Sequence, residues 1–339
     1  MIPILEWGYP IIYWLQSLGD WLTPIMQFFT FFGNEEFFLL VLPALLWCVD
    51  IGLGVRIGLI LLTSNGVNSV FKLAFGTPRP YWVNPEVKAL STGTSFGLPS
   101  GHAQTALAVW GRLAAWIHRT WAYLFFGALI LIISISRPYL GVHYPTDTLL
   151  GWLIGGVILG AFLIFDKPVS KWLSRLSAGQ QSLLSFVISI AFICLGLLMS
   201  RATANRPVPL EWIAGAAAAA PGSEAINPLS INGFFSTAGV FFGLGTGAAL
   251  LYQWGGFHVR GPWWQRLLRY LVGLVGVALI YFGFSAIFPR GDDFVANVFR
   301  YVRYGAVGFW VAYLGPRVFV LLRLANEDAQ EDQPLPPNE

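Results

Sequence analysis

Long apolar segments, separated by short polar breaks, run through most of the chain. Nine of these segments hold about 20 mainly apolar residues, the length that an α-helix needs to cross the hydrocarbon core of a bilayer. In lipid the backbone has to satisfy its own hydrogen bonds, so such segments form helices. The predicted spans are residues 35–53, 55–75, 101–118, 121–137, 147–165, 181–199, 234–253, 268–288 and 303–323. The pattern therefore predicts an all-α, polytopic helical membrane protein with about nine transmembrane helices.

The apolar region before the first span is broken by turn-forming and charged residues. Residues 5–33 contain Pro10, Gly19, Asp20 and Pro24. Breaks of this kind predict one or two interfacial or re-entrant helices instead of a full crossing. If the region does cross the membrane, the count becomes ten and the N-terminus lies on the other side.

Polar segments divide the rest of the chain. Asp166, Lys167 and Lys171 interrupt the apolar pattern and predict an amphipathic connector at the membrane surface. The acidic, proline-containing C-terminus is typical of disorder. The predicted division is N-terminal interfacial or re-entrant helices at 1–34, a core helix bundle at 35–165, the connector at 166–180, C-terminal transmembrane helices at 181–325 and a disordered acidic tail at 326–339.

The composition agrees with a protein that is solvated mostly by lipid. Only 11% of residues are charged and 56% are hydrophobic, whereas a soluble domain carries about 25% charged residues. The net charge of +3 is too small to indicate a nucleic-acid partner. Cys48 and Cys194 lie inside apolar runs, so they are interpreted as small buried hydrophobes rather than a disulfide framework.

Three polar motifs stand at the ends of predicted spans. A charged group is costly to place within a membrane, so charged residues in or beside a span usually mark function. Two crossings separate the second motif from the third, so all three reach the same face of the membrane. The motifs are Lys72 with Arg79-Pro80, then Pro99-Ser100-Gly101-His102, then Ser136-Arg137 followed by His143 and Asp147.

These residue types suit the chemistry of a phosphate ester. Lys72, Arg79 and Arg137 can stabilise the charge on the oxygens of a phosphoryl group in transfer. The segment Ser100-Gly101-His102 begins a predicted helix, whose free N–H groups and dipole favour an anion.

Two histidines suit a displacement in two steps. His143 is the better candidate for the nucleophile, because Asp147 lies four residues on and can fix the tautomer and orientation of its ring. His102 is then the general acid and base. The cations supply the charge that a metal would supply, and the sequence offers no Asp, Glu and His cluster for magnesium or zinc. We therefore expect no metal and no cofactor.

Each of these residues also has a purely structural interpretation. Lys72 could extend to the membrane interface, Ser100 could be only a helix cap, and His102 could be a satisfied polar residue in the bundle. Three residues outside the motifs also have structural interpretations. Arg112, inside a span, is expected to pair with a carboxylate or to extend inward, whereas Tyr81 and Trp82 are expected in the aromatic belt, with substrate entry as the alternative.

Taken together, the motifs resemble those of the type 2 phosphatidic acid phosphatase superfamily of membrane phosphatases. The family pattern is K-x6-R-P, P-S-G-H and S-R-x5-H-x3-D, and this chain matches it without departure across about residues 35–165. The resemblance implies that these residues form a core phosphatase bundle that works without metal. It also implies that the catalytic residues are His143, His102 and Asp147 and that the phosphate-binding residues are Lys72, Arg79, Ser100, Gly101 and Arg137.

A weaker likeness to glucose-6-phosphatase rests on Arg79-Pro80-Tyr81-Trp82, the count of nine spans and Phe242-Gly243-Leu244-Gly245.

Lys and Arg outside the motifs are more numerous on the face opposite the site, which favours an extracytoplasmic site in a plasma or inner membrane. The first hypothesis is a metal-independent phosphatase that hydrolyses a lipid phosphate or lipid diphosphate through a phosphohistidine, with membrane lipids as its partners. The alternatives are a glucose-6-phosphatase-like hydrolase of a soluble sugar phosphate and a transporter or structural membrane protein with a decayed site.

Overall fold

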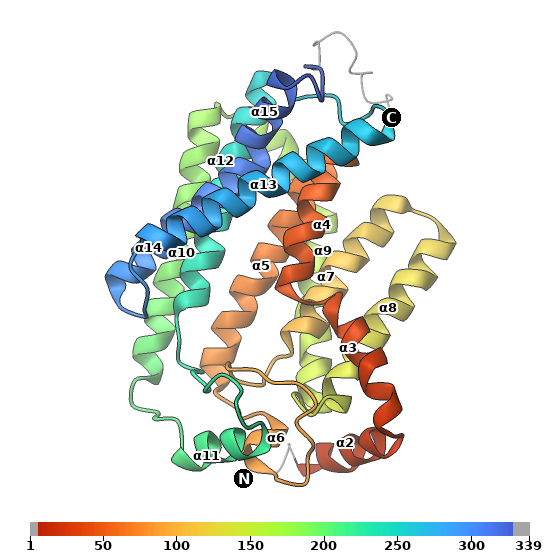
Figure 1. Ribbon diagram of the computed structural model, residues 1–339, viewed down its shortest axis with the longest axis vertical. Coiled ribbons are helices and arrows are strands. Elements are labelled where there is room, and N and C mark those ends of the chain that lie inside the picture. The colour runs from red at the N-terminus through yellow and green to blue at the C-terminus, as the bar shows by residue number, and fades with distance from the viewer. Residues whose placement is uncertain (1–5, 328–339) are drawn as a thin grey trace. The chain divides into compact units, whose positions relative to one another are not determined.

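The computed structural model describes residues 6–327, apart from the side chains of residues 35 and 36, and these residues are almost entirely helical (Figure 1). Over the described residues the only β-type pairing is an isolated bridge between Phe257 and Glu327. The helices are α2 (Gly8–Ser17), η1 (Asp20–Leu22), α3 (Thr23–Phe31), α4 (Glu35–Cys48), α5 (Ile51–Phe75), α6 (Pro80–Val83), α7 (Gly101–Ile117), α8 (Thr120–Tyr139), α9 (Pro145–Leu173), α10 (Ala178–Thr203), α11 (Leu210–Ala219), α12 (Asn232–Trp254), α13 (Trp263–Ile287), α14 (Phe294–Phe309), η2 (Trp310–Leu314) and α15 (Gly315–Leu321).

The described residues contain 7 helices long and apolar enough to cross a membrane. The chain is therefore an all-helical integral membrane protein, but the predicted count of nine spans is not confirmed. The two predicted spans at 35–53 and 101–118 correspond to the shorter helices α4 and α7, of 14 and 17 residues. Helix α4 stops before Asp50, whose side chain accepts the backbone N–H of Leu53 at 2.6 Å. Helix α7 stops at His118, which has a left-handed backbone with φ of 51°.

The N-terminal region contains short helices with a break between them. Helices α2 and α3 have 10 and 9 residues, which at 1.5 Å per residue is about 15 Å each, half the thickness of the hydrocarbon core. Gly19, with φ of 107°, stands at the break. Helix α3 packs against α8. The interfacial or re-entrant placement of this region stays a prediction.

The chain forms two compact units by packing. Unit 1 contains the described residues of Met1–Phe38, Ile60–Lys167 and Phe192–Phe234, and unit 2 contains those of Leu39–Leu59, Pro168–Ala191 and Phe235–Glu339. Each unit takes segments from several parts of the chain, so the predicted division along the sequence stays a prediction. The predicted tail at 326–339 lies outside the described residues, apart from its first two positions. All the predicted site residues belong to unit 1.

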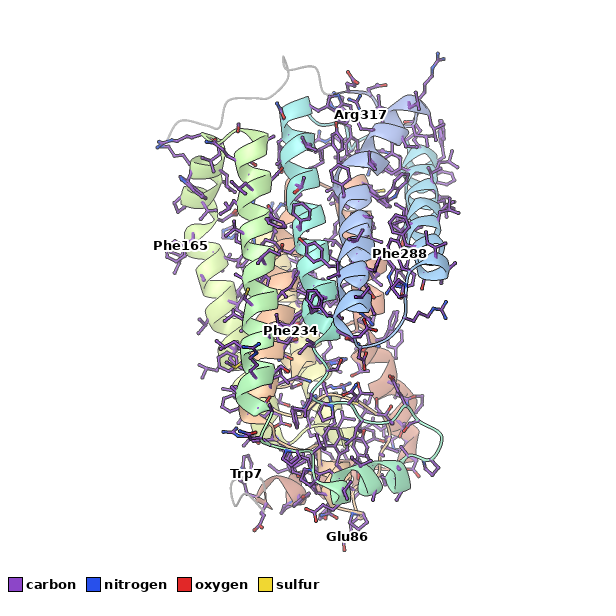
Figure 2. All side chains as sticks on the ribbon, turned by 90° about the vertical axis from the view of Figure 1, so that its left-hand side faces the viewer. Trp7, Glu86, Phe165, Phe234, Phe288 and Arg317 are labelled. Carbon is purple, nitrogen blue, oxygen red and sulfur yellow. The ribbon has the colours of Figure 1, made fainter. Side chains whose placement is uncertain are left out.

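The core of unit 1 contains the two aromatic residues that follow Arg79. Tyr81 and Trp82 are 2% and 1% exposed, so their predicted place in the aromatic belt is wrong. They lie on the short helix α6, which packs against α11, and they join a cluster with Ile12, Tyr144 and other apolar residues. In Figure 2, Trp7 and Glu86 lie at the end of unit 1 that carries α11. Residues far apart in sequence bury these rings, which the local pattern did not show.

Arg112 is paired with a carboxylate, as one of the two expectations had it. Its Nη2 lies 2.8 Å from Oδ2 of Asp166, joining α7 to α9, and the two side chains are 10% and 25% exposed. Helix α9 continues through Asp166 to Leu173, so the first half of the predicted connector is helical. A pair shielded in this way is costly to break on one side only, because the other charge is left without compensation.

We expect the substitution Asp166→Asn to lower the free energy of unfolding by about 3 kcal/mol, the scale for breaking one side of a shielded pair. The double substitution Arg112→Met with Asp166→Leu removes both charges and is expected to regain most of that loss. Thermal unfolding of the purified protein in one detergent measures both. Equal stability of the single and the double variant would contradict an energetic role for the pair.

Candidate active site

The turn between α8 and α9 positions His143 and Asp147 against each other. Nδ1 of His143 lies 3.1 Å from Oδ2 of Asp147, and the backbone N–H of Tyr144 donates to the same oxygen at 2.9 Å. The side chains of the pair are 2% and 0% exposed. A carboxylate only accepts hydrogen bonds, so Nδ1 carries the proton and Nε2 keeps its lone pair. The pair therefore fixes which ring nitrogen can act as a nucleophile.

Arg79 and Lys72 meet at one serine of the loop that precedes α7. Arg79 donates from Nε to the carbonyl of Ser95 at 2.8 Å and from Nη2 to its hydroxyl at 3.2 Å. Nζ of Lys72 donates to the same hydroxyl at 2.8 Å. Nη1 of Arg79 also reaches the carbonyl of Val142 at 3.1 Å and lies 3.4 Å from Nε2 of His143. Arg79 thus lies beside the nitrogen that carries the lone pair, and Lys72 shares the hydroxyl of Ser95 with it.

The start of α7 is tied to the start of α9. The backbone N–H of Ser100 donates to the carbonyl of Asp147 at 2.9 Å, and the hydroxyl of Ser100 accepts the N–H of Ala103 at 3.5 Å. Ser100 is fully buried. Its side chain is therefore a helix cap, the structural interpretation given for it, and this cap fixes the helix start that carries Gly101 and His102.

Arg137 and His102 are held from the end of α3. Nη1 of Arg137 donates to the hydroxyl of Thr30 at 2.6 Å. Nε2 of His102 lies 2.7 Å from Oδ1 of Asn34, in the turn that follows α3. The sequence did not single out Thr30, Asn34 or Ser95. The available signal was weak, because Thr30 is an isolated polar residue between phenylalanines, whereas Asn34 and Ser95 lie in short polar runs that fit an ordinary turn or loop.

The charges of the site act on one buried ring. His143 lies in the turn outside the membrane-spanning helices. Burial is the main cause that lowers the pKa of its imidazole well below the ordinary value. Electrostatic interactions lower this pKa further, and they come from Arg79, Arg137, Lys72 and His102. The three predicted cations and the second histidine are thus all close enough to influence it. Among the described residues, no group of three or more His, Cys, Asp or Glu could hold a metal ion.

Two stretches of the chain match known protein families. Residues 53–171 match the PAP2 superfamily, and residues 235–327 match the transmembrane extension of PAP2 superfamily phosphatases. The chain is a member of the PAP2 superfamily. This confirms the resemblance that the three motifs predicted. The second match covers most of α12 and all of α13 to α15, helices in which the sequence offered no motif beyond the short Phe242-Gly243-Leu244-Gly245.

Several curated relatives of this PAP2 protein are phosphatases. Phosphatidylglycerophosphatase B of Bacillus subtilis (strain 168) is 28% identical over 170 residues, 45% of this chain and 79% of the relative. Glucose-6-phosphatase 3 of Bos taurus is 28% identical over 187 residues, 47% of this chain and 53% of the relative. Sphingosine-1-phosphate phosphatase 1 of Rattus norvegicus is 23% identical over 333 residues, 89% of this chain and 73% of the relative. The chain therefore spans only about half the length of some relatives and most of others.

One solved structure is similar over part of the chain. It is the crystal structure of the first transmembrane PAP2 type phosphatidylglycerolphosphate phosphatase from Bacillus subtilis. Its TM-score is 0.44 at 24% sequence identity, covering 50% of this chain and 89% of that one.

The pKa of His143 leads to a test of its charge. Because the folded pKa lies below the unfolded value of about 6.5, we expect the ring to stay neutral below pH 6.5 in the folded protein. The unfolded chain then binds the extra proton in that window, so this residue lowers the stability as the pH falls below about 6.5.

Nitrogen chemical shifts of labelled histidines measure the state of the ring, with His143 assigned by the signal lost in His143→Gln. A midpoint of protonation at or above about 6.5 would overturn the expectation.

Proposed function

We propose that this PAP2 protein is a metal-independent membrane phosphatase that hydrolyses a lipid phosphate or lipid diphosphate through a phosphohistidine. The observation that carries the proposal is the ring of His143, which Asp147 holds by Nδ1 at 3.1 Å while Arg79 lies 3.4 Å from Nε2. A buried, neutral imidazole whose lone pair lies beside a guanidinium suits attack on a phosphorus atom that the same guanidinium binds.

The first step forms a bond between Nε2 of His143 and phosphorus and breaks the bond from phosphorus to the leaving oxygen. His102 gives that oxygen a proton. In the second step His102 takes a proton from water, the hydroxide forms a bond to phosphorus, and the P–N bond breaks. Inorganic phosphate leaves and His143 is neutral again. Lys72, Arg79 and Arg137 stabilise the charge on the phosphoryl oxygens throughout, and Ser100 caps the helix start at Gly101 that adds backbone N–H groups.

An apolar cavity favours a lipid as the substrate. It is open to the surface of the protein, has a volume of about 330 Å³ and is lined by Leu107, Gly127, Ile130, Leu131 and Trp152 of α7, α8 and α9. The same three helices carry His102, Arg137 and Asp147. Leu107 follows His102 by five residues, about 7.5 Å along the helix axis. The hydrocarbon part of a lipid that enters sideways between these helices can lie there while its phosphate lies at the site.

The membrane side of the site is also part of the proposal. Lys and Arg outside the motifs are more numerous on the opposite face, and the positive-inside rule assigns that face to the cytoplasm. The site then faces the extracytoplasmic side. The second candidate, hydrolysis of a soluble sugar phosphate, is supported by the similarity to Glucose-6-phosphatase 3.

His143→Ala is expected to reduce phosphate release by about 10⁴-fold or more, because removal of a covalent nucleophile costs on that scale. Release of phosphate from phosphatidic acid, phosphatidylglycerol phosphate, polyprenyl diphosphate and glucose 6-phosphate by the purified protein measures it. His118→Ala is the control, since His118 is exposed and its ring lies 3.3 Å from the hydroxyl of Tyr123. Full turnover in His143→Ala would refute the assignment of the nucleophile.

A substitution that fills the cavity separates the two substrate classes. Gly127 lines the cavity and a Cβ added there meets no atom within 4 Å, so Gly127→Phe can add bulk beside the cavity without a backbone clash. We expect kcat/KM for a long-chain lipid phosphate to fall about tenfold, while glucose 6-phosphate hydrolysis stays unchanged. Gly160→Phe is the matched control, because its Cβ also meets nothing within 4 Å and Gly160 does not line the cavity. An equal loss in both variants would count against a lipid tail in this cavity.

A further inference from the structure

Residues 30–34, at the end of α3 and in the turn after it, contact two motif residues of the candidate site. Thr30 accepts a hydrogen bond from Arg137, and Asn34 lies against His102. Both residues precede residue 53, where the match to the PAP2 superfamily begins. Neither belongs to the three motifs. The segment 30–34 therefore supplies partners to two motif residues from outside the matched region.

The contacts of the segment are close and specific. The hydroxyl of Thr30 also lies 2.9 Å from that of Ser136, which donates in turn to the carbonyl of Ile133 at 2.6 Å. A Cβ added to Gly33 would lie 2.9 Å from Cδ2 of His102. Only glycine therefore allows the backbone to lie this close to the imidazole without a shift of the ring.

We propose that Asn34 is a positioning residue for His102 and that Thr30 is a positioning residue for Arg137. The proposal rests on the proposed function, because it assigns how two residues of that mechanism are oriented. Asn34 selects the nitrogen of His102 that exchanges protons, and Thr30 fixes the direction of the Arg137 guanidinium.

The 2.7 Å contact between Oδ1 of Asn34 and Nε2 of His102 assigns the tautomer of the ring. An amide oxygen only accepts, so Nε2 carries a proton and donates it to this hydrogen bond. Nδ1 is then the nitrogen that can exchange a proton. With both nitrogens protonated, Nδ1–H gives its proton to the leaving oxygen as the P–O bond breaks. The resulting lone pair on Nδ1 takes a proton from the water that attacks the phosphohistidine. Nε2 keeps its proton through both steps.

The two histidines are thus oriented in opposite senses. Asp147 accepts from Nδ1 of His143 and leaves Nε2 for phosphorus, whereas Asn34 accepts from Nε2 of His102 and leaves Nδ1 for the proton. A carboxylate beside His102 would compete with an incoming phosphate for the cations. It would also repel the phosphate, because both are negatively charged. A neutral amide fixes the ring without adding a negative charge.

Thr30 acts on phosphate binding through the orientation of the Arg137 guanidinium. Its side chain is buried, and the 2.6 Å hydrogen bond to Thr30 fixes one nitrogen of the guanidinium. A planar guanidinium binds phosphate through two parallel N–H groups, so its rotation decides whether both reach the oxygens. Loss of the contact should weaken phosphate binding and leave the proton transfer intact.

The test compares Asn34→Leu, which keeps the size and removes the acceptor, with Asn34→Asp, which keeps an acceptor oxygen. In a single turnover we expect Asn34→Leu to slow release of an alkyl leaving group at least tenfold, a part of the 10²–10⁴ that general acid–base catalysis contributes. Release of p-nitrophenolate, a leaving group that needs little protonation, should change less than threefold. At saturating substrate, Asn34→Asp should recover most of the alkyl rate, while its negative charge weakens binding of the substrate phosphate.

Gln27→Leu is the matched control, because Gln27 lies on α3, shortly before Asn34, and its side chain donates its hydrogen bond to the carbonyl of Leu90 at 3.1 Å instead of to a motif residue. It should leave both leaving-group rates within twofold of wild type. Equal losses on the alkyl and aryl substrates in Asn34→Leu would overturn the proposal for Asn34.

A spectroscopic readout tests the same contact without activity. Nitrogen spectra of labelled histidine, with His102 assigned by the signal lost in His102→Gln, should show protonated Nε2 in the neutral ring of the wild type and a mixture of tautomers in Asn34→Leu. An unchanged tautomer in Asn34→Leu would overturn the assignment. If the wild-type protein releases no phosphate from any substrate, the proposed function fails, while this spectrum still decides the role of Asn34.

Thr30→Val removes the hydroxyl at constant shape. We expect the inhibition constant of inorganic phosphate to rise about tenfold, with the ratio of alkyl to aryl leaving-group rates unchanged. A change in that ratio with unaltered phosphate inhibition would overturn the role of Thr30.

Discussion

Asp147 joins two parts of the site, one through its carboxyl group and one through its backbone carbonyl. Its Oδ2 accepts from the ring of His143 and from the backbone of Tyr144, while its own carbonyl accepts from the N–H of Ser100. One residue in the first turn of α9 therefore sets the tautomer of a histidine and holds the start of α7. In a setting with little water, these hydrogen bonds are stronger and their loss is more costly than at a surface. Asp147 thus contacts His143 directly and holds the start of the helix that carries His102.

Small residues allow α7 and α9 to lie close enough for this arrangement. A Cβ added to Gly151 would lie 2.7 Å from the carbonyl of Ser100, and one added to Gly155 would lie 2.5 Å from that of Gln104. Hydrophobic burial does little to bring helices together in lipid, so close backbone packing at small residues contributes much of the association. The buried amides of Asn68 and Gln104, joined at 2.9 Å, add a polar contact between α5 and α7.

Much of the fold and the motifs could be predicted from the sequence because both follow from local rules. Apolar length gave the helices, and the four-residue spacing of His143 and Asp147 placed their side chains within reach of each other. The features that could not be predicted depend on contacts between segments that are far apart in the sequence. Tyr81 and Trp82 are buried by α11 and its neighbours, and the partners of Arg137 and His102 come from the end of α3. A threonine between phenylalanines, or an asparagine at the start of a short polar turn, has no period or spacing that reveals such a contact. The count of nine spans is not confirmed, because α4 and α7 are shorter than the other predicted spans and end where local backbone and capping geometry stops them.

Ser95 has a consequence for turnover. Its hydroxyl accepts from Lys72 and from Arg79, the same donors that are assigned to phosphate oxygens. In the proposed mechanism, an arriving phosphoryl group replaces this hydroxyl as the acceptor, and the hydroxyl accepts from both cations again when the product leaves. Phosphate binding is then an exchange of one oxygen for another. Without a bound phosphate, Ser95 still gives both cations a hydrogen-bond acceptor.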